Sequence, residues 1–354
     1  MLLTLVKEGA IVLNRTERNS RLKSVKDFLK QHDRYHILRG TKRFLINTFH
    51  RLFDPWYHDR IHRNYSPDSK SEGIPYIIRR HQDNVGLFSY FITILGGIAY
   101  AEQKGYIPVV DMKNYPNTYL YDSEVGHVNS WEYYFTQPDT LTLEDALSCR
   151  KYIIGKDTEF HPRPSQSASA FYNEDGKLDY WRGMCRKYIH FTQPVLDGVD
   201  RELHKFAGKR VLGVMVRGTD YVALKPHGHP VQPTAEQAII KTREVLSTGK
   251  YDTVYLVTED KKIVAKFQEV FGDKLLLPKA NYLNYDYDNP RYLADYHSDR
   301  KNDKYLRGLE YLVSMITLTK CSGLITSRTS GSTGIMCLSE GFDYLYVFDL
   351  GVYD

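Results

Sequence analysis

An arginine at the end of an apolar segment has the type and position expected of a binding residue. Arg217 follows the run V-L-G-V-M-V and precedes Gly218, Thr219 and Asp220. The run is typical of a buried strand, so we expect Arg217 at the carboxyl edge of a parallel sheet, where open α/β sheets bind ligands. A guanidinium there can donate two hydrogen bonds to a diphosphate and offset charge on a leaving nucleotide. The alternative is a structural ion pair with Asp220.

A second candidate site is rich in small hydroxyl residues and glycines. Residues 327–334 have the sequence S-R-T-S-G-S-T-G and lie between a predicted strand and a predicted helix. Backbone N–H groups at such a helix start, with the positive end of the helix dipole, form a phosphate cradle. The segment matches neither the P-loop nor G-x-G-x-x-G, and any Ser/Thr-rich helix start looks similar. The candidate phosphate contacts are Arg328, Thr329, Ser330, Gly331 and Ser332.

A third candidate site is the turn D-N-V-G before a predicted helix. Asp83, Asn84 and Gly86 can position an acceptor hydroxyl or contact a donor sugar, although Asn and Gly are also ordinary turn residues. His227 and His229 can donate hydrogen bonds or form part of a metal site. No third ligand lies at a recognisable spacing from them, so we predict no metal site.

The predicted elements that carry these residues alternate between strand and helix. A strand at 74–80, a helix at 87–104 ended by Gly105, and a strand at 106–112 form a βαβ unit of a parallel sheet. Residues 180–206 are predicted to be helical and to bend or break at Pro194. Further strands are expected at 211–216, 253–257, 275–278, 323–326 and 344–348, with helices at 234–247, 261–271, 304–319 and 335–340. This order predicts an α/β fold with two parallel sheets.

Length and composition indicate an ordinary globular protein. The 354 residues suit two domains, and the net charge of +5 is too small for a dedicated nucleic-acid binder while suiting anionic ligands. The four cysteines, Cys149, Cys185, Cys321 and Cys337, are widely spaced, which predicts reduced and buried thiols. The abundant tyrosines suit contacts with sugar rings but are also common core residues.

The N-terminal region carries most of the basic surplus. Residues 15–70 combine basic and aromatic side chains at roughly helical spacing, which predicts a basic amphipathic helix. Its cationic face is either simply solvated or attached to an anionic membrane surface. The sequence shows neither the pattern of a signal peptide nor an apolar stretch long enough to span a membrane, so we expect a soluble cytoplasmic protein. Peripheral contact with the inner face of the membrane is an alternative. The expected domains are 1–73 (basic helical extension), 74–207 and 208–354.

Four segments resemble the α1,6-fucosyltransferase and protein O-fucosyltransferase superfamily. The segment around Arg217, R-V-L-G-V-M-V-R-G-T-D-Y, is similar to the first motif of that superfamily. Residues 253–260, T-V-Y-L-V-T-E-D, are similar to the second, and K-Y-L-R-G-L-E-Y-L with G-L-I-T-S-R-T-S-G-S-T-G is similar to the third. The segment from V-G-L-F-S-Y to S-W-E-Y-Y-F also resembles the α1,6 enzymes. The similarity therefore extends from about residue 80 to 345.

The resemblance implies a GT-B-type fold, in which two Rossmann-like parallel-sheet domains face each other across a cleft. It further implies an inverting, metal-independent transfer of fucose from GDP-fucose, which is the donor substrate, with no cofactor. Carried over by position, Arg217 binds the β-phosphate and Asp220 braces it, while Thr329, Ser330 and Gly331 contact phosphate and fucose. His229 and Pro230 match a His-Pro step of the family. Asn84 and Gly86 match its first glycine-rich turn.

The chain also departs from the family pattern. Met215 and Gly218 stand where the family has a histidine and a second arginine, and Lys225 stands where the α1,6 enzymes have a proposed catalytic carboxylate. The guanine-binding aspartate has no direct counterpart, and Glu310 on the same predicted helix is the candidate.

The resulting hypothesis is a glycosyltransferase acting on a glycan or lipid-linked glycan acceptor in capsular or surface polysaccharide synthesis. Asp220, His229 and Asp83 are the candidate general bases. There are two alternatives: the same fold with another GDP- or UDP-sugar donor, or a non-catalytic nucleotide- or glycan-binding protein. The Tyr-rich segment 281–297 is either an acceptor-facing lid or an insertion with its own packing.

Overall fold

The computed structural model describes residues 56–64, 73–296 and 298–354. The chain separates into two units, Met1–His58 and Asp59–Asp354, and the fold described here is that of the second. The predicted basic amphipathic helix lies largely outside the described residues. Among the described residues, no helix is sufficiently long and apolar to span a membrane.

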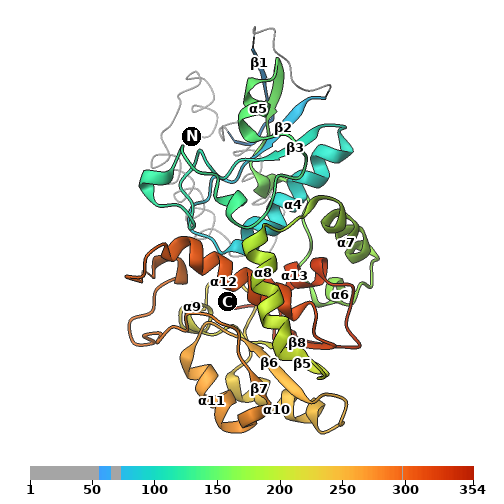
Figure 1. The fold of residues 1–354 in the computed structure, drawn as a ribbon, viewed down its shortest axis with the longest axis vertical. Coiled ribbons are helices and arrows are strands. Elements are labelled where there is room, and N and C mark those ends of the chain that lie inside the picture. Colours follow the sequence, from blue (N-terminus) through green and yellow to red (C-terminus); the bar gives the residue numbers. More distant parts are fainter. Residues whose placement is uncertain (1–55, 65–72, 297) are drawn as a thin grey trace, which may run out of the picture. The chain divides into compact units, whose positions relative to one another are not determined.

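The first sheet has the strand order β1-β4-β2-β3. Its strands are β1 (Arg60–Arg63), β2 (Pro75–Ile78), β3 (Ile107–Val110) and β4 (Lys151–Ile154). The strands β4, β2 and β3 are parallel, while β1 pairs antiparallel to β4. Helix α4 (Leu87–Gln103) connects β2 to β3 and packs against both, as predicted for the βαβ unit (Figure 1). The sequence did not predict β1 and β4, because both are short and partly exposed.

The rest of the first half consists of several short elements and two longer helices. Pro194 lies in the first turn of the second helix, α8 (Gln193–Leu203), after the first, α7 (Lys177–Tyr188), has ended. The predicted break at this proline is confirmed, because proline fits the first turn of a helix but not its interior. The short elements are α5 (Leu143–Ser148), α6 (Ala168–Phe171), η1 (Asp122–Glu124), η2 (Ser130–Tyr133), η3 (Thr158–Phe160) and η4 (His204–Phe206).

The second sheet is parallel throughout, with the order β7-β6-β5-β8-β9. Its strands are β5 (Val211–Met215), β6 (Thr253–Val257), β7 (Leu275–Leu276), β8 (Gly323–Ser327) and β9 (Tyr344–Phe348). Its helices are α9 (Thr219–Leu224), α10 (Ala235–Leu246), α11 (Lys261–Phe271), α12 (Asp303–Leu318) and α13 (Ser330–Leu338), with η5 (Gly272–Lys274) and η6 (Leu293–Asp295). The predicted α/β class with two Rossmann-like sheets is confirmed, although the first sheet also carries the antiparallel edge strand β1.

The strand order creates a topological switch point in the second sheet. The chain builds outward from β5 to β6 and β7, and then returns to place β8 and β9 on the other side of β5. Loops that leave the carboxyl ends of β5 and β8 therefore diverge, which is the arrangement that opens a ligand site in α/β sheets.

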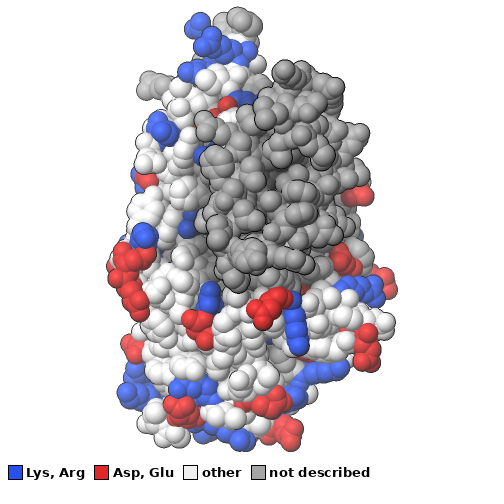
Figure 2. Space-filling model, turned by 180° about the vertical axis from the view of Figure 1, so that it is seen from behind, with Lys and Arg blue, Asp and Glu red and all other residues white. Residues whose placement is uncertain are grey.

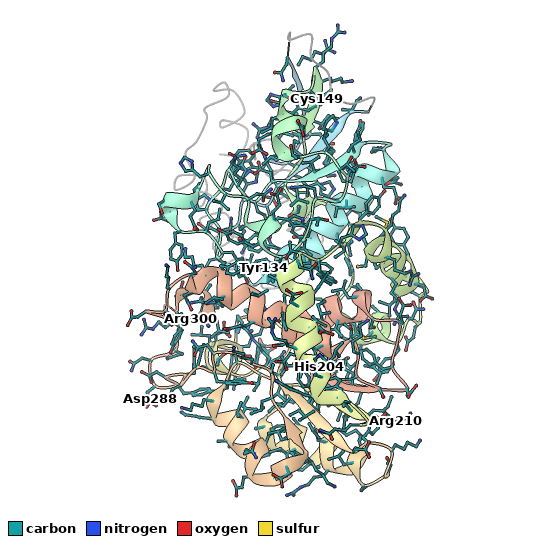
Figure 3. The ribbon with its side chains drawn as sticks, viewed as in Figure 1. Tyr134, Cys149, His204, Arg210, Asp288 and Arg300 are labelled. Carbon is teal, nitrogen blue, oxygen red and sulfur yellow. The ribbon has the colours of Figure 1, made fainter. Side chains whose placement is uncertain are left out.

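Aromatic side chains fill much of the core and link the elements of the two sheets. Tyr134 donates a hydrogen bond from its hydroxyl to the Tyr305 carbonyl at 3.0 Å, and Phe88 of α4 packs edge-on against Tyr311 of α12 at 5.6 Å (Tyr134 is labelled in Figure 3). Many of the abundant tyrosines are thus core residues with bonded hydroxyls. The four cysteines are free and buried, as predicted.

Candidate functional site

The candidate residues Arg217, Thr329 and Ser330 lie at the carboxyl edge of the second sheet. Arg217 follows β5 by two residues, and Thr329 and Ser330 follow the neighbouring strand β8. Glu259 follows β6, the neighbour of β5 on the other side. The parallel register brings these three strand ends together at the switch point. The edge predicted from the sequence is therefore the edge on which they lie.

Arg217 is held between two carboxylates. Its Nη2 lies 2.9 Å from Asp220 Oδ1, and its Nε lies 3.7 Å from Glu259 Oε1. The guanidinium also lies over the Tyr221 ring, 4.9 Å from the ring centroid. Burial alone would lower the pKa of Arg217, but Glu259 and Asp220 outweigh it and raise the pKa above its ordinary value. The arginine is therefore a fixed cation, and the structural ion pair that the sequence left open is present.

The turn after Arg217 has an unusual backbone. Thr219 has φ +52°, which is strained for a β-branched residue. Its hydroxyl donates to Glu259 Oε1 at 2.7 Å, and the Gly218 N–H donates to the same oxygen at 3.0 Å. A Cβ atom added at Gly218 would lie 2.8 Å from Ile263 Cδ1 and 3.1 Å from Asp260 Oδ2. Only glycine leaves room for this close approach.

The predicted hydroxyl-rich turn is shorter than expected, because α13 begins at Ser330 instead of at residue 335. Thr329 is the N-cap and accepts a hydrogen bond from the Ser332 N–H at 3.0 Å. The Ser332 hydroxyl donates to the Ser327 carbonyl at 2.5 Å and is buried. Ser332 is thus engaged inside the fold, while the first N–H groups of α13 form a helix start next to the switch point.

Glycine at the start of α13 brings side chains from two other elements close. A Cβ atom added at Gly331 would lie 2.6 Å from the Tyr311 hydroxyl and 3.5 Å from Met215 Cε. Tyr311 is electrostatically coupled to Arg217, while burial, the larger effect, raises the pKa of Tyr311 to about 12. The Tyr311 hydroxyl therefore lies against the start of α13, and its pKa is also affected by the charge of Arg217.

Arg328 and Ser330 are partly engaged with a loop of the first half. Arg328 donates from Nε to the Gln166 carbonyl at 2.9 Å and pairs with Asp349 Oδ1 at 2.5 Å. Ser330 accepts a hydrogen bond from Gln166 Nε2 at 3.0 Å. Arg328 therefore has structural partners, whereas Ser330 keeps its backbone N–H at the helix start.

His229 lies against Tyr221, the residue that covers Arg217. Its Nδ1 is 3.2 Å from the Tyr221 hydroxyl, and the two rings meet edge to face at 5.2 Å. Partial burial lowers the pKa of His229, and Asp220 opposes this shift. His229 is thus a neutral side chain at pH 7 that reaches the Arg217 turn through Tyr221.

The turn D-N-V-G reaches the same region through the segment that contains η6. Asn84 donates from Nδ2 to Asp295 Oδ1 at 3.0 Å, and the Leu293 N–H donates to Asp220 Oδ2 at 3.1 Å. Gly86 is the N-cap of α4, with open space where a side chain would stand, and the Asp83 carbonyl accepts a hydrogen bond from Thr118 at 3.1 Å. The structure therefore connects the third predicted site to Asp220 through residues 293–295.

Glu310 is engaged with other partners. Its Oε1 lies 2.6 Å from Arg300 Nη1, and its Oε2 accepts a hydrogen bond from the Asn281 N–H at 3.2 Å (Arg300 is labelled in Figure 3). Glu310 precedes Tyr311 on α12 but has no direct bond to Arg217 among the bonds of the described residues. To bind a nucleobase, its carboxylate has to exchange at least one of these partners.

Two site residues were not singled out from the sequence: Glu259 and Gln232. Glu259 belongs to the segment T-V-Y-L-V-T-E-D, and its position two residues after a predicted strand indicates a residue at the sheet edge. Gln232 is buried, accepts a hydrogen bond from Ser327 at 2.6 Å and donates to the Pro230 carbonyl at 2.9 Å, contacts that only the folded chain reveals. Within the described part of the chain, no group of three or more His, Cys, Asp or Glu side chains is arranged to hold a metal ion.

Comparison with solved structures finds fucosyltransferases. A crystal structure of fucosyltransferase NodZ from Bradyrhizobium aligns with a TM-score of 0.46 and 14% identity, over 80% of this chain and 97% of that chain. POFUT1 in complex with GDP-fucose aligns with a TM-score of 0.45 and 8% identity, over 80% and 99%. No protein-family model and no curated protein sequence matches this chain. Because these TM-scores are below 0.5, the interpretation of the site rests on its own geometry.

Proposed function

We propose that this protein is an inverting glycosyltransferase that transfers a sugar from a nucleotide-sugar donor to a glycan hydroxyl. Fucose from GDP-fucose is the proposed donor, on the basis of the sequence motifs around Arg217 and residues 323–334. The proposed acceptor is a glycan or lipid-linked glycan of surface polysaccharide synthesis, modified on the cytoplasmic side of the membrane.

One observation carries the proposal: Arg217 and the start of α13 flank the switch point of a parallel sheet. An anionic diphosphate placed there meets the guanidinium from one strand end and helix N–H groups from the next. Arg217 and Ser330 follow the neighbouring strands β5 and β8, which supports their acting on one ligand.

The geometry supports a reaction in which charge develops on the leaving group. As the acceptor oxygen bonds to the anomeric carbon, the bond from that carbon to the β-phosphate oxygen breaks, and the nucleotide leaves with an additional negative charge. Arg217 and the start of α13 offset that charge. Because Asp220 and Glu259 fix the arginine before the donor binds, little reorganisation is needed during the reaction.

The acceptor hydroxyl has to lose a proton, and three groups remain candidates for the base. Asp220 already accepts hydrogen bonds from Arg217 and Leu293, which favours a bracing role. The pKa of His229 is lowered, so its imidazole is neutral at pH 7 and can accept a proton. Asp83 lies beside Asn84 on the turn that reaches residues 293–295. We propose His229 as the first of the three to test.

A non-catalytic nucleotide-binding protein is the second candidate function. The ion pairs of Arg217 with both Asp220 and Glu259 favour it, because an arginine already paired twice has less charge to offer a leaving group. The missing second arginine at Gly218 favours it as well.

Nucleotide release from a panel of GDP- and UDP-sugars separates these functions. The glycosyltransferase predicts slow release of GDP from GDP-fucose by hydrolysis, accelerated when an acceptor glycan is present. Release from a different sugar nucleotide would keep the enzyme class and change the donor. Tight GDP binding with no release from any donor, over a broad set of glycan acceptors, would contradict the proposal and favour the binding protein.

A further inference from the structure

The backbone of Thr219 is strained, and contacts close to it in space have to hold it in this conformation. Thr219 is fully buried and follows Gly218 in the turn that begins at Arg217. A positive φ costs a β-branched residue free energy and persists only where surrounding contacts impose it. The contacts made by the backbone of Thr219 therefore determine how the Arg217 turn is shaped.

Tyr287 makes that contact from a distant part of the chain. The Thr219 N–H donates a hydrogen bond to the Tyr287 hydroxyl at 3.2 Å, and this hydroxyl donates in turn to Asp260. Asp260 is buried and also caps α11, accepting a hydrogen bond from the Lys262 N–H at 2.7 Å. The phenol is thus a bridge between the strained peptide and a carboxylate fixed at the end of β6.

The ring of Tyr287 is itself held in place. Lys262 Nζ lies 4.8 Å from its centroid, and Tyr285 meets it edge to face at 5.0 Å. Upstream, Leu283 pairs with the loop after β6, donating from its N–H to the Glu259 carbonyl at 2.8 Å and accepting from the Lys261 N–H at 3.0 Å. The hydroxyl of Tyr287 therefore approaches Thr219 from an anchored segment.

We propose that Tyr287 is a positioning residue that imposes the strained conformation of Thr219 and thereby fixes Arg217 for the donor diphosphate. The inference rests on the proposed function for its effect on turnover, but the hold on Thr219 is a property of the fold alone. Arg217 and Thr219 share one short turn, since Gly218 alone separates them and both side chains bind Glu259. A Thr219 peptide released to negative φ would redirect Gly218 and shift the guanidinium relative to Glu259.

Tyr287→Phe and Tyr285→Phe form a matched pair. Each substitution keeps the ring and removes one accepted and one donated hydrogen bond. Among the residues that the structure describes, the Tyr285 hydroxyl bonds only to the backbone of Arg291, within its own segment. Amide hydrogen exchange of residues 217–221 reports the hold directly. We expect Y287F to raise exchange at Thr219 by roughly tenfold, the effect of one or two lost hydrogen bonds, and Y285F to leave it within about twofold. Equal exchange in the two variants would overturn the proposal.

Turnover supplies the second measurement, by nucleotide release from GDP-fucose. We expect Y287F to lower kcat about tenfold more than Y285F does, at a similar KM. Thr219→Gly removes the strain, because glycine adopts positive φ freely. In a T219G background, Y287F should therefore cost less than about threefold, whereas an equal factor in both backgrounds would overturn the role in positioning. Wild type that releases no nucleotide, with the exchange difference intact, would sink the proposed function and leave Tyr287 as the residue that holds this turn.

Discussion

The pKa and the position of single residues in this protein depend on the charged groups that the fold brings close to them. Arg217 stays charged because Asp220 and Glu259 approach it within 2.9 and 3.7 Å. Its position and its Asp220 partner were predictable from the spacing R-G-T-D. Glu259 comes from a strand end 42 residues later in the chain, and only the pairing of β5 with β6 brings the two together.

His161 gives a prediction at the same scale. Burial, the largest cause, lowers the pKa of this histidine to about 4, with Lys156 lowering it further and Asp59 opposing. Its Nε2 lies 3.3 Å from the Tyr76 hydroxyl and its ring 4.7 Å from that of Tyr100. Because the unfolded chain takes up a proton near pH 6.5 and the folded chain does not, stability is full above pH 6.5 and declines as the pH falls towards 4.

Urea unfolding at several pH values checks this. We expect His161 to contribute a loss of about 3 kcal/mol between pH 6.5 and 4, and His161→Gln to remove that part of the pH dependence. If wild type and H161Q lose the same stability over this range, the buried histidine is not responsible.

Helices and strands with clear periodicity were predicted closely, and those shaped by neighbours were not. Strand β6 and helix α11 have the predicted limits, since an apolar strand and a helix capped by Asp260 are local features. Helix α13 begins five residues earlier than predicted. The prediction failed because glycines are more typical of a turn than of a helix interior. Gly331 and Gly334 instead lie in the helix, where they admit Tyr311 and Phe88 from other elements.

The space around two glycines in helices predicts opposite effects on stability when each is replaced by alanine. A Cβ atom at Gly334 would lie 2.0 Å from Phe88 Cδ1, whereas no atom of the described residues lies within 4 Å of one at Gly183 in α7. Gly334→Ala should destabilise the fold by about 1–3 kcal/mol through overpacking. Gly183→Ala should stabilise it by roughly 0.5–1 kcal/mol through helix propensity. Urea unfolding of the two variants tests this, and a G334A protein at least as stable as wild type would refute the close contact.

At the scale of the whole molecule, the alternation of elements predicted two parallel sheets. It did not predict which residues of the first half bond to residues of the second. The hydrogen bond between Asn84 and Asp295 joins positions 211 residues apart, and no local pattern encodes it. The net charge and the distribution of charged residues in the sequence did not indicate where the site lies either. On the lower part of the face in Figure 2, Lys and Arg side chains are interspersed with Asp and Glu. The domain limits at residues 73 and 207 stay predictions.

The central claim is that Arg217 binds the donor diphosphate, and calorimetric titration with GDP tests it most directly. Arg210, at the other end of β5, offers a matched control, because it also forms an ion pair, at 2.5 Å with Asp343. We predict that Arg217→Ala weakens GDP binding by at least about tenfold, the loss of one or more hydrogen bonds to a charged group, in a protein that remains folded. Arg210→Ala should bind GDP within about twofold of wild type. GDP binding by a folded R217A protein with the affinity of wild type would contradict the account.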